Sequence, residues 1–481
     1  MTPSYVISSS DLASVHPELW LCGAGALILL LDAFIPALRR LWTTPLALVG
    51  LIGAAWLNWG LANGPSFGGL IESTAVSRVL ATVVLLAATL ATLGSESYLR
   101  REKILRGEYH ALLLWCCCGL LLMLRATELL TIFLGLELLS VCLYALAGYH
   151  RRVAVATEAA IKYFLMGAFV SAFVLLGIAL LYGETGSTRL EAIGTALAAG
   201  RGSGVLETLG LLLLVCGFAF KMSVIPFHAW APDTYQGAPS PFVAFLSVAP
   251  KAASAAVLAR VLMLATGSAA AEYLSHRWPA LIAGLAVASM IGGNLLALVQ
   301  RDIKRMLAYS GVAHMGYLLI AFASLDPSAW RPILVYLVAY ALMNAGAFVL
   351  IGLLYTRPGE QHLISDLSGW GYRYPFLAAC LAICMLSLGG LPPTLGFLGK
   401  YMVFVHAVSH QQIWLAVVGV LASLVGVFYY LRVVYVLYMK DEVRAPEGLL
   451  IDNWGRLAAL VAAGGSLLLG LWPSALLSWL S

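Results

Sequence analysis

Residues 216–230 read CGFAFKMSVIPFHAW, an apolar stretch with a lysine, a proline and a histidine inside it. An ammonium group in an oily segment costs free energy. Pro226 interrupts a helix because it has no backbone N–H and its ring clashes with the preceding turn. The stretch therefore predicts a helix that breaks soon after Lys221, where the chain must surround a buried charge with polar groups. The rest of the sequence indicates whether this buried lysine belongs to a soluble or to a membrane protein.

The composition indicates an integral membrane protein. Hydrophobic residues make up 61% of the 481 residues and charged residues only 11%, against about 25% charged residues in soluble domains. Apolar runs approach the ~20 residues that a helix needs to cross a bilayer. Unbroken runs such as residues 21–38 lack the alternation of barrel strands. Because helices satisfy their own backbone groups in lipid, we expect an all-α polytopic membrane protein forming a single membrane domain.

The hydropathy pattern predicts fourteen transmembrane helices. They cover residues 18–38, 43–62, 78–98, 110–125, 127–148, 159–182, 206–228, 240–266, 278–299, 305–325, 330–355, 375–407, 412–439 and 456–479. With the N-terminus outside, sixteen of the 28 Lys and Arg residues fall in inside loops, six in outside segments and six within spans. Because basic residues prefer cytoplasmic loops, we expect a multi-pass protein of the bacterial cytoplasmic (inner) membrane with both termini on the outer, periplasmic side.

Two spans predict discontinuous helices, and they lie five spans apart. The seventh contains Pro226, and the twelfth contains SLGGLPPTLGFLGK (387–400), in which Pro392 and Pro393 precede Lys400. Paired broken helices in the two halves of a transporter point to its ion path. Units of five spans have opposite orientations in the membrane, so we expect an inverted repeat. The expected parts are an N-terminal three spans (1–98), two five-helix repeats (110–266 and 278–439) and a C-terminal span (456–479).

Four ionisable residues lie well inside their spans: Glu137, Lys221, Lys251 and Lys400. Each costs ~2.5–3.5 kcal/mol at membrane depth, so such residues usually face the bundle interior or a wet cavity. Burial disfavours the charged form of a lysine, and a close glutamate favours it. The protonation of a buried lysine therefore depends on whether its glutamate partner is close or distant. A single buried lysine is explained equally well as part of a structural ion pair or as a side chain that extends to the membrane interface. Three lysines and one glutamate in one bundle favour a charge-transfer path.

Span 10 offers side chains that could extend this path. His314 and Ser310 lie four residues apart, on one face of the predicted helix, and Tyr309 lies next to Ser310. Histidine titrates near neutral pH and can relay protons. A lone buried histidine is more often structural, but its serine and tyrosine neighbours in a lysine-bearing bundle favour a relay at His314.

Other polar residues are weaker candidates. His228, beside the predicted break, could gate an inner entrance or cap the broken helix. Lys162 follows Glu158 by four residues, where a simple i,i+4 ion pair accounts for both. Tyr429 and Tyr430 in span 13 could relay protons, but packing is the better interpretation for both.

The sequence predicts no cofactor on this chain. Its eight cysteines form no CxxC pair and no spacing typical of zinc or iron–sulfur sites. No GxGxxG follows a strand, and no GxxxxGK[ST] occurs. The basic residues behind the net charge of +5 lie in short loops, so we expect no nucleic-acid partner, no metal and no bound redox cofactor.

Five motifs carry a family resemblance: GLELLS around Glu137, FKMSVIPFHAWAPDTYQGAPSP around Lys221, APK around Lys251, IKRMLAYSGVAHMGY and LPPTLGFLGKYMVF. Together, from about residue 100 to 440, they resemble the antiporter-like proton-translocating subunits of respiratory complex I, the NADH:quinone oxidoreductase. WAPDTYQGAP, the short chain and a lysine in the twelfth span favour the member nearest the quinone-side small subunits.

The resemblance implies a non-redox subunit of a proton-pumping translocase, coupled to quinone reduction elsewhere in the complex. It implies a Glu137–Lys221 pair, a central Lys251 and an outlet Lys400. It also implies that NADH, FMN, iron–sulfur clusters and quinone lie on partner subunits, with antiporter-like subunit M and small membrane subunits as neighbours. Two alternatives stay open: a membrane subunit of a multi-subunit cation/proton antiporter, and a scaffold that fills the membrane arm without conducting.

Overall fold

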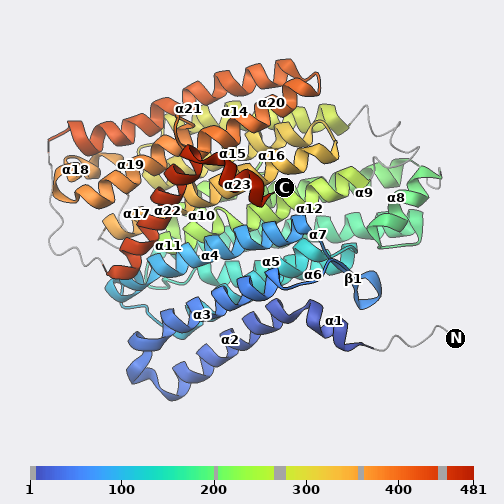
Figure 1. The fold of residues 1–481 in the computed structure, drawn as a ribbon, viewed down its shortest axis with the longest axis horizontal. Coiled ribbons are helices and arrows are strands. Elements are labelled where there is room, and N and C mark those ends of the chain that lie inside the picture. The colour runs from blue at the N-terminus through green and yellow to red at the C-terminus, as the bar shows by residue number, and fades with distance from the viewer. Residues whose placement is uncertain (1–6, 200–203, 265–277, 356–361, 442–451, 481) are drawn as a thin grey trace.

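Helices make up nearly all of the computed structural model, which describes residues 7–199, 204–264, 278–355, 362–441 and 452–480. Most of them run side by side along the long axis of the molecule (Figure 1). The one sheet of the described ranges is an antiparallel pair of three-residue strands, β1 (Gly64–Ser66) and β2 (Ile71–Ser73). The predicted all-α class is confirmed.

The first half of the chain supplies the helices shown in blue to green. They are α1 (Ser9–Ser14), α2 (His16–Phe34), η1 (Pro36–Leu38), α3 (Arg39–Trp59), η2 (Phe67–Gly69), α4 (Ala75–Arg101), α5 (Gly107–Arg125), α6 (Leu129–Ala147), α7 (Ala154–Thr185), α8 (Leu190–Ala198), α9 (Val205–Met222), α10 (Trp230–Gly237), α11 (Ser240–Leu246) and α12 (Ala249–Leu264). The last two residues of the predicted span 240–266 lie outside the described residues.

The second half supplies the helices shown in yellow to red. They are α14 (Trp278–Leu298), α15 (Ile303–Phe322), η3 (Pro327–Ala329), α16 (Trp330–Tyr340), η4 (Ala341–Ala345), α17 (Gly346–Leu354), η5 (Ile364–Leu367), α18 (Trp370–Arg373), α19 (Pro375–Gly389), α20 (Leu395–Ser409), α21 (Ile413–Met439), α22 (Asn453–Leu471) and α23 (Pro473–Trp479). Among these, η4 is a single π-helical turn that joins α16 to α17.

Twelve helices of the described residues are long and apolar enough to cross a membrane. Two further elements lie among them in the chain: α15, of 20 residues, and the pair α19 and α20, of 15 residues each. The fourteen predicted spans require α15 to cross once and the pair to cross together. That number stays a prediction, whereas the polytopic helical architecture does not depend on it.

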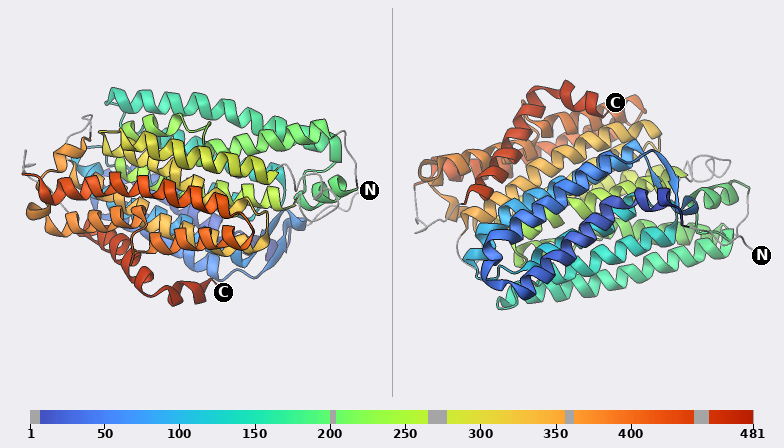
Figure 2. Two further views of the ribbon diagram at one scale, coloured as in Figure 1. Left: turned by 90° about the horizontal axis from the view of Figure 1, so that it is seen from above. Right: turned by 60° about the horizontal axis from the view of Figure 1, so that its bottom comes forward.

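The most buried spans lie in the middle of the bundle. Ser240–Leu262 and Pro327–Leu354 are buried along their whole apolar windows, against 28% of the window in α2 and 33% in α7 and α22. The two turned views show α7 and α22 at the outside of the molecule (Figure 2). Helix α7 has an exposed apolar surface that includes Phe164, Leu165 and Phe169. Such a surface is suited to contact with lipid tails rather than water.

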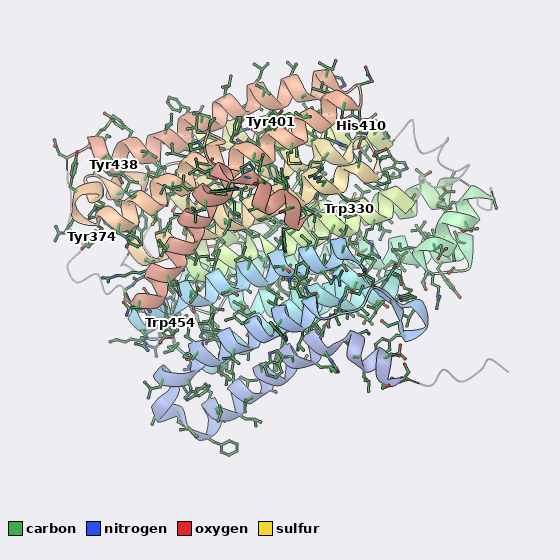
Figure 3. All side chains as sticks on the ribbon, viewed as in Figure 1. Trp330, Tyr374, Tyr401, His410, Tyr438 and Trp454 are labelled. Carbon is green, nitrogen blue, oxygen red and sulfur yellow. The ribbon has the colours of Figure 1, made fainter. Side chains whose placement is uncertain are left out.

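Aromatic side chains mark one end of the bundle. Tyr374, Tyr438 and Trp454 lie together at the end where α19 and α22 begin (Figure 3). Tyrosine and tryptophan are enriched where a membrane meets water, since each ring has an apolar body and a polar atom. These residues therefore indicate a membrane–water boundary at that end.

A buried ion pair attaches the N-terminal helices to the bundle. Arg125, the last residue of α5, pairs with Glu18 of α2, and its Nη1 donates to the Ser14 carbonyl at 2.6 Å. Both side chains are buried. A charge buried in this way depends on its partner, because neither can be left unpaired without a large desolvation cost.

Candidate functional site

The predicted break in span 7 is present. Helix α9 ends at Met222, and Ser223 adopts a left-handed conformation at φ 61°. The Val224 amide then donates back to the Ala219 carbonyl at 2.9 Å, a closure typical of helix C-termini. Pro226 follows in the connection to α10, so the chain leaves the helix directly after Met222, one residue beyond Lys221, and does not continue straight.

The break in span 12 is built the same way. Gly390 takes the left-handed position at φ 79°, and the Leu391 amide donates to the Leu386 carbonyl at 3.1 Å. Pro392 and Pro393 fill the gap before α20 begins at Leu395. Both predicted discontinuous helices are therefore confirmed, and both end in the same backbone closure.

Lys221 lies in a polar and aromatic cage. Its Nζ donates to Ser140 Oγ of α6 at 2.8 Å and lies 5.4 Å and 5.7 Å from the ring centroids of Tyr144 and Tyr163. Trp230 stacks on Tyr163 at 4.5 Å. An ammonium over an aromatic face gains cation–π energy of about 2 kcal/mol when desolvated, so the cage partly offsets the cost of burial.

Glu137 lies on the same helix as Ser140, about one turn away. Its Oε1 atom is buried without a hydrogen-bond partner. The ion pairs found among the described residues do not include one between Glu137 and Lys221. In this structure the lysine is held by the serine, and the predicted Glu–Lys pair is open.

Lys251 is the most enclosed of the lysines. It follows a short turn at residues 247–248 between α11 and α12, and its Nζ has no hydrogen-bond partner in the described structure. The Nζ lies 5.6 Å from the Tyr235 ring. A Cβ added at Gly311 would lie 2.8 Å from Lys251 Nζ and 3.0 Å from Tyr340 Oη. Both polar atoms therefore face the same glycine of α15.

Two irregularities beside Lys251 were not predicted from the sequence. Pro250 lacks the N–H that would continue α11 into α12, so the turn at 247–248 interrupts span 8. Opposite it, the π-helical turn η4 follows Tyr340, and Asn344 Nδ2 of that turn donates to Ser247 Oγ at 2.8 Å. Such π-turns occur frequently at functional sites.

His314 connects three helices by hydrogen bonds. Its Nδ1 lies 2.7 Å from Tyr336 Oη of α16, and its Nε2 lies 3.1 Å from Tyr430 Oη of α21. Ser310 Oγ also bonds Tyr430 Oη. The Tyr340 ring lies 5.3 Å from the imidazole. The predicted grouping of His314 with Ser310 is therefore present, through a tyrosine that both contact.

Lys400 lies against the end of the broken helix. Its Nζ donates to the Leu388 and Gly389 carbonyls at 3.1 Å and 2.9 Å and to Ser423 Oγ at 2.8 Å. The terminal carbonyls of a helix carry partial negative charge that favours a cation. The Nζ also lies 5.0 Å from the Tyr317 ring. The break thus provides the acceptors that hold this lysine.

None of the three central lysines pairs with a carboxylate in the part of the chain that the structure describes. Lys221, Lys251 and Lys400 are nonetheless only 3%, 0% and 5% exposed. Their neighbours are hydroxyls, aromatic rings and backbone carbonyls. Such groups can hold a lysine in either protonation state, which a fixed ion pair cannot.

The weaker candidates lie around this core. Lys162 pairs with Glu158 at 2.7 Å, as expected, and also with Asp233 at 3.0 Å. Arg305 of α15 binds the other oxygen of Asp233 at 2.7 Å. Asp233 thus links the two halves of the chain. This contact was not predicted, because nothing in the sequence places Asp233 next to Lys162 or Arg305.

Three further candidates contribute differently. The half-buried His228 ring lies 6.2 Å from Tyr309, and its Nδ1 has no hydrogen-bond partner in the described structure. Tyr429 donates to Asn294 Oδ1 at 2.9 Å, away from His314. Tyr430, the next residue, is the one that bonds the histidine.

Comparison with known proteins identifies the family. The protein-family model described as "NADH:quinone oxidoreductase/Mrp antiporter, TM" matches residues 126–426, more than half of the chain. The chain belongs to this family. A relative from Trichlorobacter lovleyi named NADH-quinone oxidoreductase subunit N is 40% identical over 477 residues, covering 98% of this chain and 96% of the relative.

Two solved structures have a similar fold. A chain of respiratory complex I from Thermus thermophilus with bound aureothin has TM-score 0.80 and 33% identity, covering 97% of this chain and 99% of that one. A chain of the Mrp complex from Dietzia sp. DQ12-45-1b has TM-score 0.80 at 20% identity, covering 98% of this chain and 96% of that one. The second likeness shows a common fold alone. The predicted family is confirmed, and relatives matching nearly the whole chain carry the name of its subunit N.

Proposed function

We propose that this chain is the proton-translocating subunit N of an NADH:quinone oxidoreductase, and that its own part is non-redox. The observation that carries the proposal is the set of three buried lysines, Lys221, Lys251 and Lys400, which have no carboxylate partner among the residues that the structure describes. Two of them lie beside broken helices. Sequence relatives named subunit N support the assignment to that complex.

The proposed path begins at Lys221. Ser140 holds its ammonium form, and Glu137, one turn away, provides a charge that can draw the lysine toward it. Movement of Lys221 between these two partners changes its affinity for a proton, because a nearby carboxylate stabilises the charged form. Quinone chemistry elsewhere in the complex would bias this choice through a neighbouring charge.

Lys251 and His314 form the middle of the path. Tyr340 lies next to both. Its Oη and Lys251 Nζ both lie against Gly311, and its ring lies 5.3 Å from the His314 imidazole. Tyr340 Oη and Lys251 Nζ are both buried without partners in the described structure. Buried polar groups of this kind favour a water molecule as a bridge, and water can relay a proton.

Lys400 is the proposed outlet. From His314, a proton passes along Tyr430 and Ser310, which bond one another. The Lys400 amine then takes it up beside the terminal carbonyls of α19, which stabilise the ammonium. In this proposal, residues 110–266 and 278–439 are the two units of the inverted repeat. The broken helix α9–α10 of the first unit is equivalent to the broken helix α19–α20 of the second.

The orientation and the partners belong to the same proposal. Both termini face the outer side of the bacterial inner membrane, and the end with Tyr374 and Trp454 faces the cytoplasm. NADH, FMN, iron–sulfur clusters and quinone lie on partner subunits, and subunit M with its small neighbours contacts this chain in the membrane arm. The similar solved structures, a complex I and an Mrp complex, support a membrane-arm setting.

The first test is assembly. Mildly solubilised membranes are separated on a native gel, probed for this chain and stained for NADH dehydrogenase activity. We expect one large band with both signals. A chain that runs apart from all NADH activity would instead favour a cation/proton antiporter, for which cation exchange in vesicles is the readout.

The second test addresses the path. In an assembled complex, Lys221→Ala removes the first carrier, and we expect a loss of coupled NADH:quinone turnover of roughly 10²-fold or more, as for the loss of a positioned proton-transfer group. Lys440→Ala, at the end of α21, removes a lysine of the same charge outside the cage and serves as the control. Native pumping by assembled Lys221→Ala would overturn the proposal, and assembly defects alone would favour a scaffold.

A further inference from the structure

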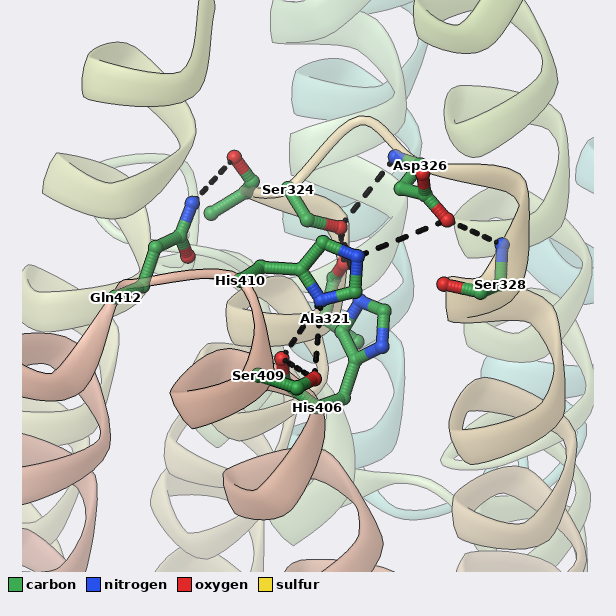
Figure 4. A network of polar contacts seen from close by, with 9 residues as sticks. Ala321, Ser324, Asp326, Ser328, His406, Ser409, His410 and Gln412 are labelled. Atoms are coloured by element: carbon green, nitrogen blue, oxygen red, sulfur yellow. Dashed lines mark hydrogen bonds and ion pairs between the residues drawn. The ribbon is translucent and has the colours of Figure 1, made fainter.

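A second polar cluster lies where α15 and α20 end, at the end of the bundle opposite Tyr374 (Figures 3 and 4). His406 Nε2 lies 2.9 Å from Ser324 Oγ, and the His406 and His410 rings lie 4.1 Å apart. His410 Nε2 faces Asp326 Oδ1 at 3.7 Å. The path described above does not use these groups.

The hydrogen bonds fix which ring nitrogens can titrate. Ser324 donates its hydroxyl hydrogen to the Ala321 carbonyl at 3.0 Å, so its oxygen accepts from His406 Nε2. His410 Nδ1 faces the His406 carbonyl at 2.9 Å and must donate, because a carbonyl only accepts. His406 Nδ1 and His410 Nε2 are therefore the atoms that can take up and release a proton.

Exposure increases along the cluster. Lys400 and His406 are 5% and 8% exposed, whereas the His410 and Asp326 side chains are 29% and 44% exposed. Hydrogen bonds from the Ser328 hydroxyl and amide hold the pKa of Asp326 below its usual value. Asp326 therefore stays charged and faces His410 Nε2 at the water boundary.

An apolar layer separates this cluster from Lys400. His406 follows Lys400 by six residues on α20, a rise of about 9 Å. Between these levels, Phe404 and Ile320 pack against Gly419, where an added Cβ would lie 2.6 Å and 3.0 Å from them. These contacts place apolar atoms between the level of Lys400 and the level of His406.

We propose that His406 and His410, positioned by Ser324 and Asp326, are the proton-release station between Lys400 and the outer water. His406 Nδ1 accepts the proton that leaves the Lys400 ammonium. His410 Nε2 passes it to water beside Asp326. This inference rests on the proposed function, because it extends the same path by one stage.

The polar neighbours of the two histidines come from several elements. The end of α15 contributes Ser324, the loop before α16 contributes Asp326 and Ser328, and Ser409 lies between the histidines on their own segment. Gln412, at the start of α21, donates to the Ala323 carbonyl at 2.8 Å. Among these groups Asp326 is the one carboxylate, and it faces His410 Nε2.

The test uses the assembled complex in membranes made permeable to protons, so that turnover is measured without a gradient. His406→Gln keeps a donor for Ser324 but cannot titrate, and His406→Ala removes both properties. His16→Gln, an exposed histidine at the start of α2, is the matched control. Lys400→Ala is measured in parallel, and each variant is checked for assembly on a native gel.

We expect His406→Gln to lower NADH:quinone turnover by about tenfold, the smaller end of what a positioned proton-transfer group contributes, because nearby water replaces part of it. Added imidazole should restore turnover of His406→Ala, which a purely structural role would not allow. His16→Gln should match the native complex. Lys400→Ala should be slow with or without imidazole.

Three results would overturn the inference, and they can be told apart. If His406→Gln and His406→Ala both turn over at the native rate while Lys400→Ala is slow, the release station is wrong and the lysine path stands. If Lys400→Ala also turns over at the native rate, the proposed function fails with it. A slow His406→Ala that imidazole does not restore assigns His406 a structural role and rejects the release station.

Discussion

Gly390 offers a sharp test of how the break holds Lys400. Its φ of 79° is a conformation that alanine adopts at a cost of about 1–2 kcal/mol. An alanine Cβ there would lie 2.8 Å from Lys400 Cδ and 3.1 Å from its Nζ. Because carbon atoms in contact prefer about 3.5–4.0 Å, the lysine must shift by roughly 1 Å.

That shift has a predictable consequence. Lys400 would lose the geometry of its bonds to the Leu388 and Gly389 carbonyls, and a misplacement of about 1 Å costs on the order of 10²-fold in a reaction that depends on position. We therefore expect Gly390→Ala to lower coupled turnover by about 10- to 100-fold. The assay is NADH-driven quinone reduction with proton pumping recorded in sealed vesicles.

The neighbouring glycine is the control. A Cβ at Gly389 would meet atoms no closer than 3.7 Å, and alanine is about 1 kcal/mol better than glycine within a helix. Gly389→Ala should therefore assemble and pump like the native complex. If assembled Gly390→Ala also pumps at the native rate, the reasoning that the break positions Lys400 is refuted.

Three further substitutions test other contacts. Ser140→Ala removes the hydroxyl that holds Lys221; a hydrogen bond to a charged group contributes about 1.5–3 kcal/mol, so coupled turnover should fall about tenfold or more, and an unchanged rate would count against this contact. Arg125→Ala leaves Glu18 buried without its partner and should destabilise the packing of α2 by about 3–5 kcal/mol, measured as a lower melting temperature or faster proteolysis of the N-terminal helices; native values would contradict it. Tyr340→Phe removes one hydroxyl at the centre and should slow turnover about tenfold without altering assembly on a native gel, whereas a native rate would exclude that hydroxyl from the path.

The sequence was most informative where a residue is costly. A lysine in an apolar span is conspicuous because of its desolvation cost, which is why Lys221, Lys251 and Lys400 could be predicted. Proline and glycine in a span are equally conspicuous, and both predicted breaks are present. The family followed from the motifs that surround these residues.

The groups that surround the lysines could not be predicted in the same way. Tyrosine and serine cost little in a helix bundle, so Tyr340 and Ser140 gave no signal although they lie beside Lys251 and Lys221. For Tyr430 the sequence favoured packing, whereas its hydroxyl bonds His314. Contacts across the fold, such as Asp233 with Arg305, depend on how distant helices pack. The π-helical turn after Tyr340 is likewise a tertiary outcome, since its residues Ala341–Ala345 read as ordinary helix.

The central claim is that the buried lysines carry protons, and Lys251 tests it most directly because its Nζ has no hydrogen-bond partner to lose in the described structure. Lys251→Met keeps an unbranched, apolar side chain nearly as long as the lysine stem and lacks the amine. The measurement is the number of protons moved per NADH oxidised by the assembled variant in sealed vesicles. Our account predicts a lower ratio, or coupled turnover too slow to sustain pumping. An assembled Lys251→Met complex with the native ratio at the native rate would contradict it.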